Sequence, residues 1–155
     1  MKDIKILDVT CGSRTIWFNK NHPNAIYTDK RVESHELNGH QCNVNPDIIA
    51  DFTNLPFEDE SFYLVVFDPP HLTRLGETAW LAKKYGRLFP GWETQIKGGI
   101  DECMRVLKPN GILVFKWNER DIKTRMILDL IEIEPLFGHT TGSNAQTMWM
   151  TFMKL

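Results

Sequence analysis

The chain has 155 residues, of which 42% are hydrophobic and 25% charged, and its formal net charge is −2. This composition is that of a globular protein and excludes a disordered chain, and the length suits one domain with a sizeable core. The slightly negative charge excludes a protein that is drawn to nucleic acid by an overall basic field.

The three cysteines cannot all pair with one another, and their spacing gives no disulfide framework. The first residues lead directly into a predicted strand, so we expect no signal sequence, and no apolar run approaches the length of a membrane span. These features favour the reducing cytoplasm and predict no association with a membrane.

Strands alternate with helices along the chain, which predicts an α/β fold with a mostly parallel sheet and helices on both faces. We expect seven strands, near residues 4–9, 25–29, 48–50, 62–67, 112–117, 131–136 and 147–153. We expect helices near residues 14–20, 73–86, 93–107 and 119–130. The glycine-rich link at residues 138–144 predicts that the last strand pairs antiparallel.

The segment between the second and third strands, residues 30–46, has no helical period. It contains His35, His40 and Cys42, but their spacing fits no structural zinc pattern. We therefore interpret the segment as a solvated loop or a lid, and we predict no metal site.

The first motif, residues 6–15, is predicted as a strand, a tight turn and a helix start, with Gly12 allowing the backbone to approach a ligand closely. Asp29 follows Asp8 by 21 residues and ends the next apolar stretch. In dinucleotide-type sheets an acidic residue at that place accepts hydrogen bonds from ribose hydroxyls.

The second motif is Asp68-Pro69-Pro70-His71, directly after the apolar run at residues 62–67. Two consecutive prolines cannot continue a central strand, because neither nitrogen carries a donor. A carboxylate on a stiff turn therefore projects beyond the end of a buried strand. In open α/β sheets ligands bind at that place.

Together these motifs resemble those of class I S-adenosylmethionine-dependent methyltransferases, and specifically of the amino-methyltransferases that modify exocyclic amines of nucleobases. Residues 8–14 are similar to the pattern D-x-F-x-G-S-G, from which Thr10 and Arg14 depart. Residues 68–71 resemble the catalytic pattern [D/N/S]-P-P-[Y/F/W], except that His71 stands at the aromatic position.

Two further segments carry the resemblance over roughly the whole chain. Residues 51–62 resemble the segment that presents an adenine-contacting aspartate, and residues 102–111 resemble the helix and turn that enter the fifth strand. The resemblance implies a Rossmann-like class I methyltransferase fold and a single methyltransferase domain at residues 1–155, without a separate target-recognition domain.

The resemblance also implies S-adenosyl-L-methionine as the cofactor. It places Gly12 near the methionine part, Asp29 at the ribose hydroxyls and Asp51 at the adenine amine. The other cofactor-binding positions that it implies are Asp8, Thr10, Cys11, Ser13, Lys30 and Phe52.

In that family the catalytic carboxylate and the carbonyl of the first proline accept the two N–H bonds of the target amine. This gives the roles of amine acceptors to Asp68 and Pro69, with Pro70 completing the rigid turn. His71 takes the place of the aromatic residue that stacks on the flipped base.

Residues 72–92 mix aromatic and cationic side chains, which suits stacking on bases and contact with phosphates. The same aromatics have helical spacing and equally fit a stripe that faces the core. The substrate-binding residues that we predict are Arg74, Trp80, Lys84, Trp117 and Asn118.

The sequence therefore predicts methylation of adenine N6 or cytosine N4 in DNA, with nucleic acid (DNA or RNA) as the partner. The sequence also leaves open a partner subunit that supplies target recognition. An amine on RNA, on a protein side chain or on a small molecule is the alternative substrate. A catalytically inactive cofactor-binding subunit or interaction module is the other alternative, because Arg14 and His71 depart from the family patterns.

Overall fold

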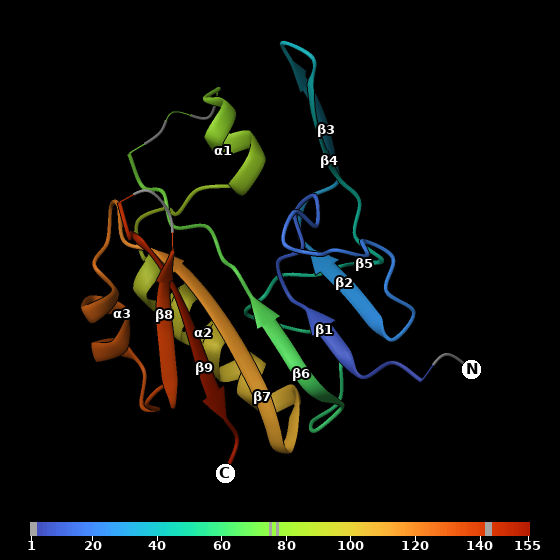
Figure 1. Ribbon diagram of the computed structural model, residues 1–155, viewed down its shortest axis with the longest axis vertical. Helices are drawn as coiled ribbons and strands as arrows, with labels where there is room; N and C mark the ends of the chain where they lie inside the picture. Colours follow the sequence, from blue (N-terminus) through green and yellow to red (C-terminus); the bar gives the residue numbers. More distant parts are fainter. Residues whose placement is uncertain (1–2, 75, 77, 142–143) are drawn as a thin grey trace.

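The computed structural model describes residues 3–74, 76, 78–141 and 144–155. Its main feature is a seven-stranded sheet with the order β5-β2-β1-β6-β7-β9-β8 (Figure 1). The strands of this sheet are β1 (Ile6–Asp8), β2 (Ala25–Asp29), β5 (Ile48–Ile49), β6 (Phe62–Phe67), β7 (Leu107–Asn118), β8 (Phe137–Thr141) and β9 (Thr147–Met153).

The direction of the strands confirms the predicted sheet. The pairs from β5 to β7 are all parallel, including β1 beside β6. Strand β9 pairs antiparallel with both β7 and β8, so it runs against the rest of the sheet. A seven-stranded, mostly parallel sheet with an antiparallel last strand is thus present.

Helices α2 (Trp92–Val106) and α3 (Thr124–Leu130) pack on the same face of the sheet, and Figure 1 shows α2 passing behind the strands. That face is the main core, in which a row of buried side chains crosses four strands through Leu7, Val65, Leu113 and Phe152. Ile127 of α3 joins the same cluster. Within the described residues, helices therefore cover one face rather than both.

The opposite face of β1 and β2 is covered by an irregular segment instead of the predicted helix at residues 14–20. Arg14 has a left-handed backbone (φ 56°), which interrupts a helix at its start. Its guanidinium donates to the carbonyls of Lys20 and Asn45, at 2.7 and 3.0 Å, and holds the segment as a series of turns. Trp17 packs edge-on against Tyr27, with ring centroids 5.0 Å apart.

Close packing of α2 on the sheet depends on Gly99. A Cβ at this position would lie 2.7 Å from ring carbons of both Phe52 and Phe67. Real side chains cannot approach so closely, so any larger residue forces the helix or the rings to move. Around this contact Ile96 and Ile100 of α2 are almost completely buried.

Two predicted helices are shorter than expected. The region predicted as a helix at residues 73–86 contains only α1 (Trp80–Tyr85), and Leu75 and Glu77 of that range lie outside the described residues. The helix predicted at residues 119–130 begins at Thr124. None of the described helices is long and apolar enough to cross a membrane.

The predicted strand at residues 131–136 is wrong. Strand β8 begins at Phe137 and contains most of the segment predicted as a glycine-rich link. Pro135 has no N–H to donate to a sheet, so the apolar alternation before it could not continue as a strand.

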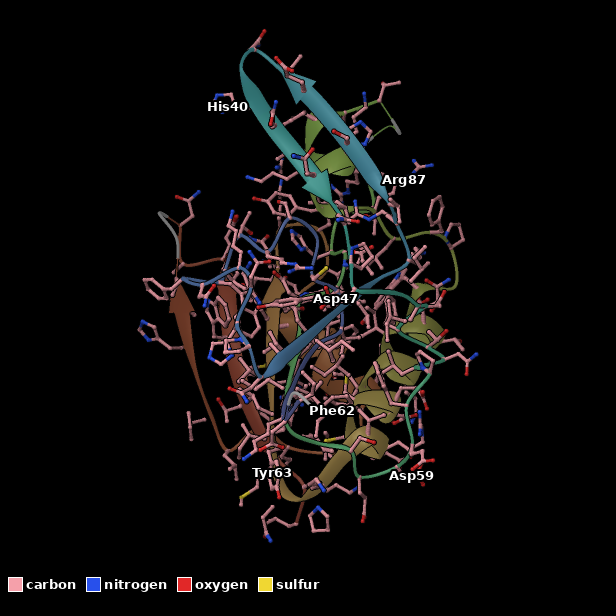
Figure 2. The ribbon with its side chains drawn as sticks, turned by 90° about the vertical axis from the view of Figure 1, so that its right-hand side faces the viewer. His40, Asp47, Asp59, Phe62, Tyr63 and Arg87 are labelled. Atoms are coloured by element: carbon pink, nitrogen blue, oxygen red, sulfur yellow. The ribbon has the colours of Figure 1, made fainter. Side chains whose placement is uncertain are left out.

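Residues 30–46 form a β-hairpin rather than a loop. Strands β3 (Glu33–Leu37) and β4 (His40–Val44) pair antiparallel and are joined by Asn38 and Gly39, which both have positive φ (49° and 79°). The hairpin projects from the body of the protein, with His40 near its tip (Figure 2). Among the described residues no three His, Cys, Asp or Glu side chains gather as metal ligands.

Candidate active site

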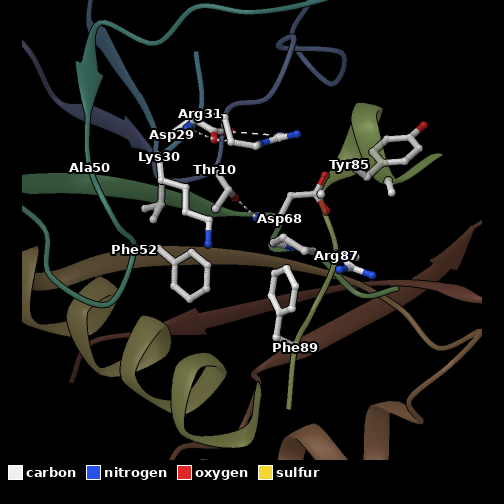
Figure 3. A pocket seen from close by; sticks show the side chains of 14 residues that line it. Thr10, Asp29, Lys30, Arg31, Ala50, Phe52, Asp68, Tyr85, Arg87 and Phe89 are labelled. Atoms are coloured by element: carbon white, nitrogen blue, oxygen red, sulfur yellow. Dashed lines mark hydrogen bonds and ion pairs between the residues drawn. The ribbon is translucent and has the colours of Figure 1, made fainter. Parts of the chain in front are cut away.

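A cavity of about 220 Å³ lies at the carboxyl ends of β1, β2 and β6 (Figure 3). Thr10, Asp29 and Asp68 line it from the strand ends, whereas Tyr85 and Gly86 line it from α1 and the residue after it. A smaller neighbouring cavity is lined by residues of both sequence motifs, including Cys11, Gly12, Ser13, Asp68, Pro69 and His71. The two sequence motifs therefore meet at one site.

Asp29 ends β2 and is only 5% exposed. One carboxylate oxygen accepts a hydrogen bond from the backbone N–H of Gly12 at 3.0 Å, and the other accepts from the backbone N–H of Arg31 at 3.0 Å. The guanidinium of Arg31 adds an ion pair at 3.2 Å. Gly12 (φ 49°) has a backbone conformation that L side chains rarely adopt, so a glycine suits this turn.

Asp68 follows the last residue of β6 and is held from two sides. Its backbone N–H donates to Thr10 Oγ1 at 3.0 Å, which fixes the second motif to the first. Its carboxylate accepts from Lys116 Nζ of β7 at 2.9 Å. The side chains of both ion-pair partners are about one-fifth exposed (20% and 19%), so the carboxylate is accessible from the cavity.

Asp8 lines neither cavity but supports the first turn from beneath. It is 1% exposed and accepts hydrogen bonds from Trp17 Nε1 at 2.7 Å and from the backbone N–H of Thr10 at 3.3 Å. Burial raises the pKa of its carboxyl to about 7, and the charge of nearby Asp68 adds to the increase. The structure thus gives Asp8 a supporting role rather than direct contact with a cofactor.

Asp51 also has a local role. Its carboxylate accepts from the backbone N–H and the hydroxyl of Thr53, at 2.9 and 2.7 Å, as a cap of the following turn. Partial burial opposes its ionisation, but these hydrogen bonds lower its pKa overall. Its neighbours Ala50 and Phe52, rather than Asp51 itself, line the larger cavity, as does Lys30.

His71 lies between two aromatic rings, with centroid distances of 6.2 Å to both Tyr85 and Trp117. Burial lowers the pKa of its imidazole, which is therefore neutral at pH 7. Its Nδ1 is buried and has no hydrogen-bond partner among the described residues. His71 thus has a flat neutral ring beside Asp68, but one that is packed rather than open.

The predicted substrate-binding residues do not form one surface. Lys84 lines the smaller cavity, with its ammonium 5.0 Å from the centroid of the Tyr85 ring. Trp80 is half-buried at the start of α1 and lines neither cavity. Arg74 lines a separate cavity of about 170 Å³ together with Arg120.

The two predicted residues from the end of β7 belong to the scaffold. The structure places Trp117 in the core, fully buried, with its indole N–H donating to the carbonyl of Ile122 at 2.9 Å. Asn118 donates to Thr147 Oγ1 across the β7–β9 pair at 3.0 Å. Neither side chain lines the cavities that contain Asp68.

The residues of the site that were not among the predicted ones include Arg31 and Tyr85, which line both cavities, and Lys116, which pairs with Asp68. Lys116 could have been found, because it lies two residues before Asn118 on a strand adjacent to β6, and alternate residues share a face. Arg31 follows Asp29 by two residues in a segment without periodicity, and no sequence pattern points to its role.

No protein-family model and no curated protein match the sequence. Solved structures match the fold along its length. The PH0226 protein of Pyrococcus horikoshii has a TM-score of 0.62 and 12% identity, covering 97% of this chain and 82% of its own. An S-adenosylmethionine-dependent methyltransferase of Methanosarcina mazei has a TM-score of 0.56 and 17% identity, covering 100% and 94%.

A third similar structure is the N-methyltransferase NodS of Bradyrhizobium japonicum, in complex with S-adenosyl-L-homocysteine. Its TM-score is 0.57 and its identity 14%, with coverage of 97% of this chain and 78% of that one. At these identities the likeness concerns the fold. The chain has the class I methyltransferase fold.

Proposed function

We propose that the protein is an S-adenosylmethionine-dependent methyltransferase that methylates an amine nitrogen. The observation that carries the proposal is the position of Asp29 and Asp68. The two carboxylates come from the ends of β2 and β6 and line one cavity at the carboxyl edge of a methyltransferase-type sheet. In open α/β sheets this edge is where ligands bind.

The cavity offers a suitable group for each part of the cofactor. The Asp29 carboxylate is an acceptor for the two ribose hydroxyls. The apolar wall at Ala50 and Phe52 suits the adenine ring. The backbone of the Gly12 turn, in the neighbouring cavity, suits the methionine part. S-adenosyl-L-methionine bound in this way supplies an electrophilic methyl group near Asp68.

The chain's own residues would orient the acceptor. An aromatic amine is a poor nucleophile because its lone pair is delocalised into the ring. Asp68 and the carbonyl of Pro69 accept its two N–H bonds and turn the lone pair toward the methyl carbon. A carbon–nitrogen bond would form as the carbon–sulfur bond breaks, with S-adenosylhomocysteine as the leaving group and the proton of the nitrogen passing to water.

The acceptor that we propose is the exocyclic amine of a nucleobase, adenine N6 or cytosine N4, in DNA. The Asp-Pro-Pro loop supports this choice, as do the rings of His71 and Tyr85 beside the smaller cavity. We place this activity in the cytoplasm, where the three buried, free cysteines would stay reduced. A partner subunit that presents the DNA is compatible with the absence of a strongly basic charge.

A small-molecule amine is a second candidate, and the position of α1 favours it. Residues of α1 and the following turn line the same cavity as Asp68, so they cover it from one side. A base on a polymer has to enter the cavity beside this segment. A small amine needs less space.

Calorimetric titration with S-adenosylmethionine and S-adenosylhomocysteine tests the cofactor site. Transfer of labelled methyl groups to DNA, RNA, protein and small-amine pools then identifies the acceptor. We expect micromolar binding and labelling of DNA. Labelling of small amines alone would select the second candidate, and a protein that binds neither cofactor form would contradict the proposed function.

A further inference from the structure

Arg31 lies where three parts of the protein meet. Its Nε pairs with Asp29 of β2 at 3.2 Å, and its Nη1 donates to the carbonyl of Lys83 in α1 at 3.0 Å. The same nitrogen is 3.8 Å from the carboxylate of Glu33 at the start of the β3–β4 hairpin. The side chain is only 16% exposed, so these contacts surround it.

Arg31 occupies much of the acceptor capacity of Asp29. One oxygen of Asp29 accepts from the Arg31 backbone N–H and from its Nε, and the other accepts from Gly12 N–H and lies 3.5 Å from Arg31 Nη2. A carboxylate has about four lone-pair sites. The two backbone donors belong to the turns that form the site, so an incoming ribose diol has to replace the guanidinium.

The same guanidinium holds α1 over the cavity. It binds the last turn of a helix, where carbonyls lack partners and where a positive charge is favourable. At the base of this segment the N–H of Leu88 donates to the carbonyl of Leu72 at 2.8 Å. Beside Arg31, Gly86 packs on the catalytic loop so closely that a Cβ there would lie 3.1 Å from Pro70 Cγ.

We propose that Arg31 is a latch between the ribose site and α1, so that binding of a ribose diol at Asp29 displaces the guanidinium and releases α1 from the cavity. Arg31 is in this sense a positioning residue, which orders the two binding events. The cofactor binds first, and its ribose opens the side on which the methyl acceptor reaches Asp68. This inference rests on the proposed function for the identity of the ligand.

The first test is amide hydrogen exchange of α1 without any ligand. In Arg31→Ala, the α1 amides that bond within the helix, such as Gly86 N–H to Ala82, should exchange roughly tenfold faster than in wild type, because a charge-assisted hydrogen bond is lost. Amides of α2 should not change. Lys83→Gln is the matched control, because Arg31 contacts the backbone carbonyl of Lys83, which this substitution keeps. Its α1 amides should exchange at the wild-type rate. Wild-type exchange in Arg31→Ala would overturn the latch.

The second test uses adenosine, which has the ribose diol without the methionine part, and 2′,3′-dideoxyadenosine, which lacks the diol. Adenosine should accelerate α1 exchange in wild type, whereas the dideoxy compound and the Arg31→Ala background should show no acceleration. Because coupling is reciprocal, Arg31→Ala should bind adenosine roughly fivefold more tightly. Weaker adenosine binding in this variant, or slower α1 exchange on binding, would overturn the proposal.

The two tests separate the latch from the proposed function. If neither nucleoside binds wild type or variant, the cofactor site is misplaced, while the exchange comparison without ligand still decides whether Arg31 holds α1. In Arg31→Lys, the ammonium should contact either the α1 carbonyl or Asp29 but not both. The α1 amides of this variant should exchange at a rate between those of wild type and Arg31→Ala.

Discussion

Strands β2 and β6 both end in a carboxylate at the same edge of the sheet, yet the two carboxylates are held in different ways. Asp29 is 5% exposed and is held by two backbone N–H groups and one guanidinium. The side chain of Asp68 is 19% exposed and pairs with one lysine of the next strand. The difference indicates a carboxylate at β2 whose acceptor capacity is largely occupied by its neighbours, and a carboxylate at β6 with free acceptor capacity.

The largest effect should come from the β6 end. Asp68→Ala should lower turnover roughly 10²–10³-fold, because an acceptor that orients the amine in the transition state is lost. Affinity for the cofactor should change little. Single-turnover methyl transfer together with calorimetry measures both quantities. If turnover in Asp68→Ala equals that of wild type, Asp68 does not orient the amine, and the proposed difference between the ends of β2 and β6 is wrong.

Substitution of Asp29, at the end of β2, should affect cofactor affinity rather than the rate of methyl transfer. Asp29→Ala should weaken cofactor affinity by about 1.5–3 kcal/mol, because a charged acceptor of the ribose hydroxyls is removed. Titration of S-adenosylhomocysteine into wild type, Asp29→Ala and Asp29→Asn measures this loss. The asparagine variant keeps one neutral acceptor and should lie between the other two. Unchanged affinity in the alanine variant would mean that the ribose binds elsewhere.

A third carboxylate, Asp8 at the end of β1, sharpens the comparison because no cationic side chain of the described residues pairs with it. Burial raises its pKa from 3.8 to about 7 in the folded protein, so the folded state binds this proton more tightly than the unfolded chain does. This contribution to stability is complete below about pH 4 and is lost as the pH rises through about 7, which costs on the order of a few kcal/mol.

Urea unfolding at pH 5 and pH 8 measures this dependence. Asp8→Asn keeps an acceptor for Trp17 and should be more stable than wild type at pH 8, with a smaller difference at pH 5. Asp129→Asn, which alters an exposed helix residue, should keep the wild-type dependence. If Asp8→Asn is the less stable protein at pH 8, the buried carboxylate is not the cause.

The smallest effect should come from the partner of Asp68. Lys116→Met should lower turnover about threefold to tenfold, because a partly exposed ion pair contributes little and Asp68 keeps its backbone position through Thr10. The same methyl-transfer assay measures this change. A loss as large as that of Asp68→Ala would show that the ammonium, rather than the carboxylate, is the important group at this strand end.

The elements with strong periodicity or specific end residues could be predicted from the sequence. The parallel direction of most strands, the position of α2 and the place of the Gly12 turn and Asp68 beyond strand ends all followed from buried strands and the residues after them. The Asn38-Gly39 pair was a signal for the β3–β4 hairpin that the prediction missed, because this dipeptide suits two-residue turns with positive φ.

Other features depend on contacts that are distant in sequence. Arg14 has an ordinary position for a helix start, but its backbone is left-handed and its guanidinium bonds to Asn45 and Asp47, which lie 31 and 33 positions away. Trp117 has the same type and spacing as a cleft aromatic, but its strand position directs it into the core. The contact of Arg31 with Lys83 joins residues that are 52 positions apart, which no local pattern reveals.

The size of the residue at position 99 limits the shape of the cavity wall that Phe52 forms. Gly99 is in α2, which packs on a face of the sheet, and it contacts Phe52, whose ring also lines the cavity. A methyl group at position 99 would force the Phe52 ring, the Phe67 ring or the helix to move. Helix α2 contributes no side chain to the cavity, but it determines the position of part of the cavity wall. A substitution at position 99 should therefore change the shape of the space that is available to the ligand.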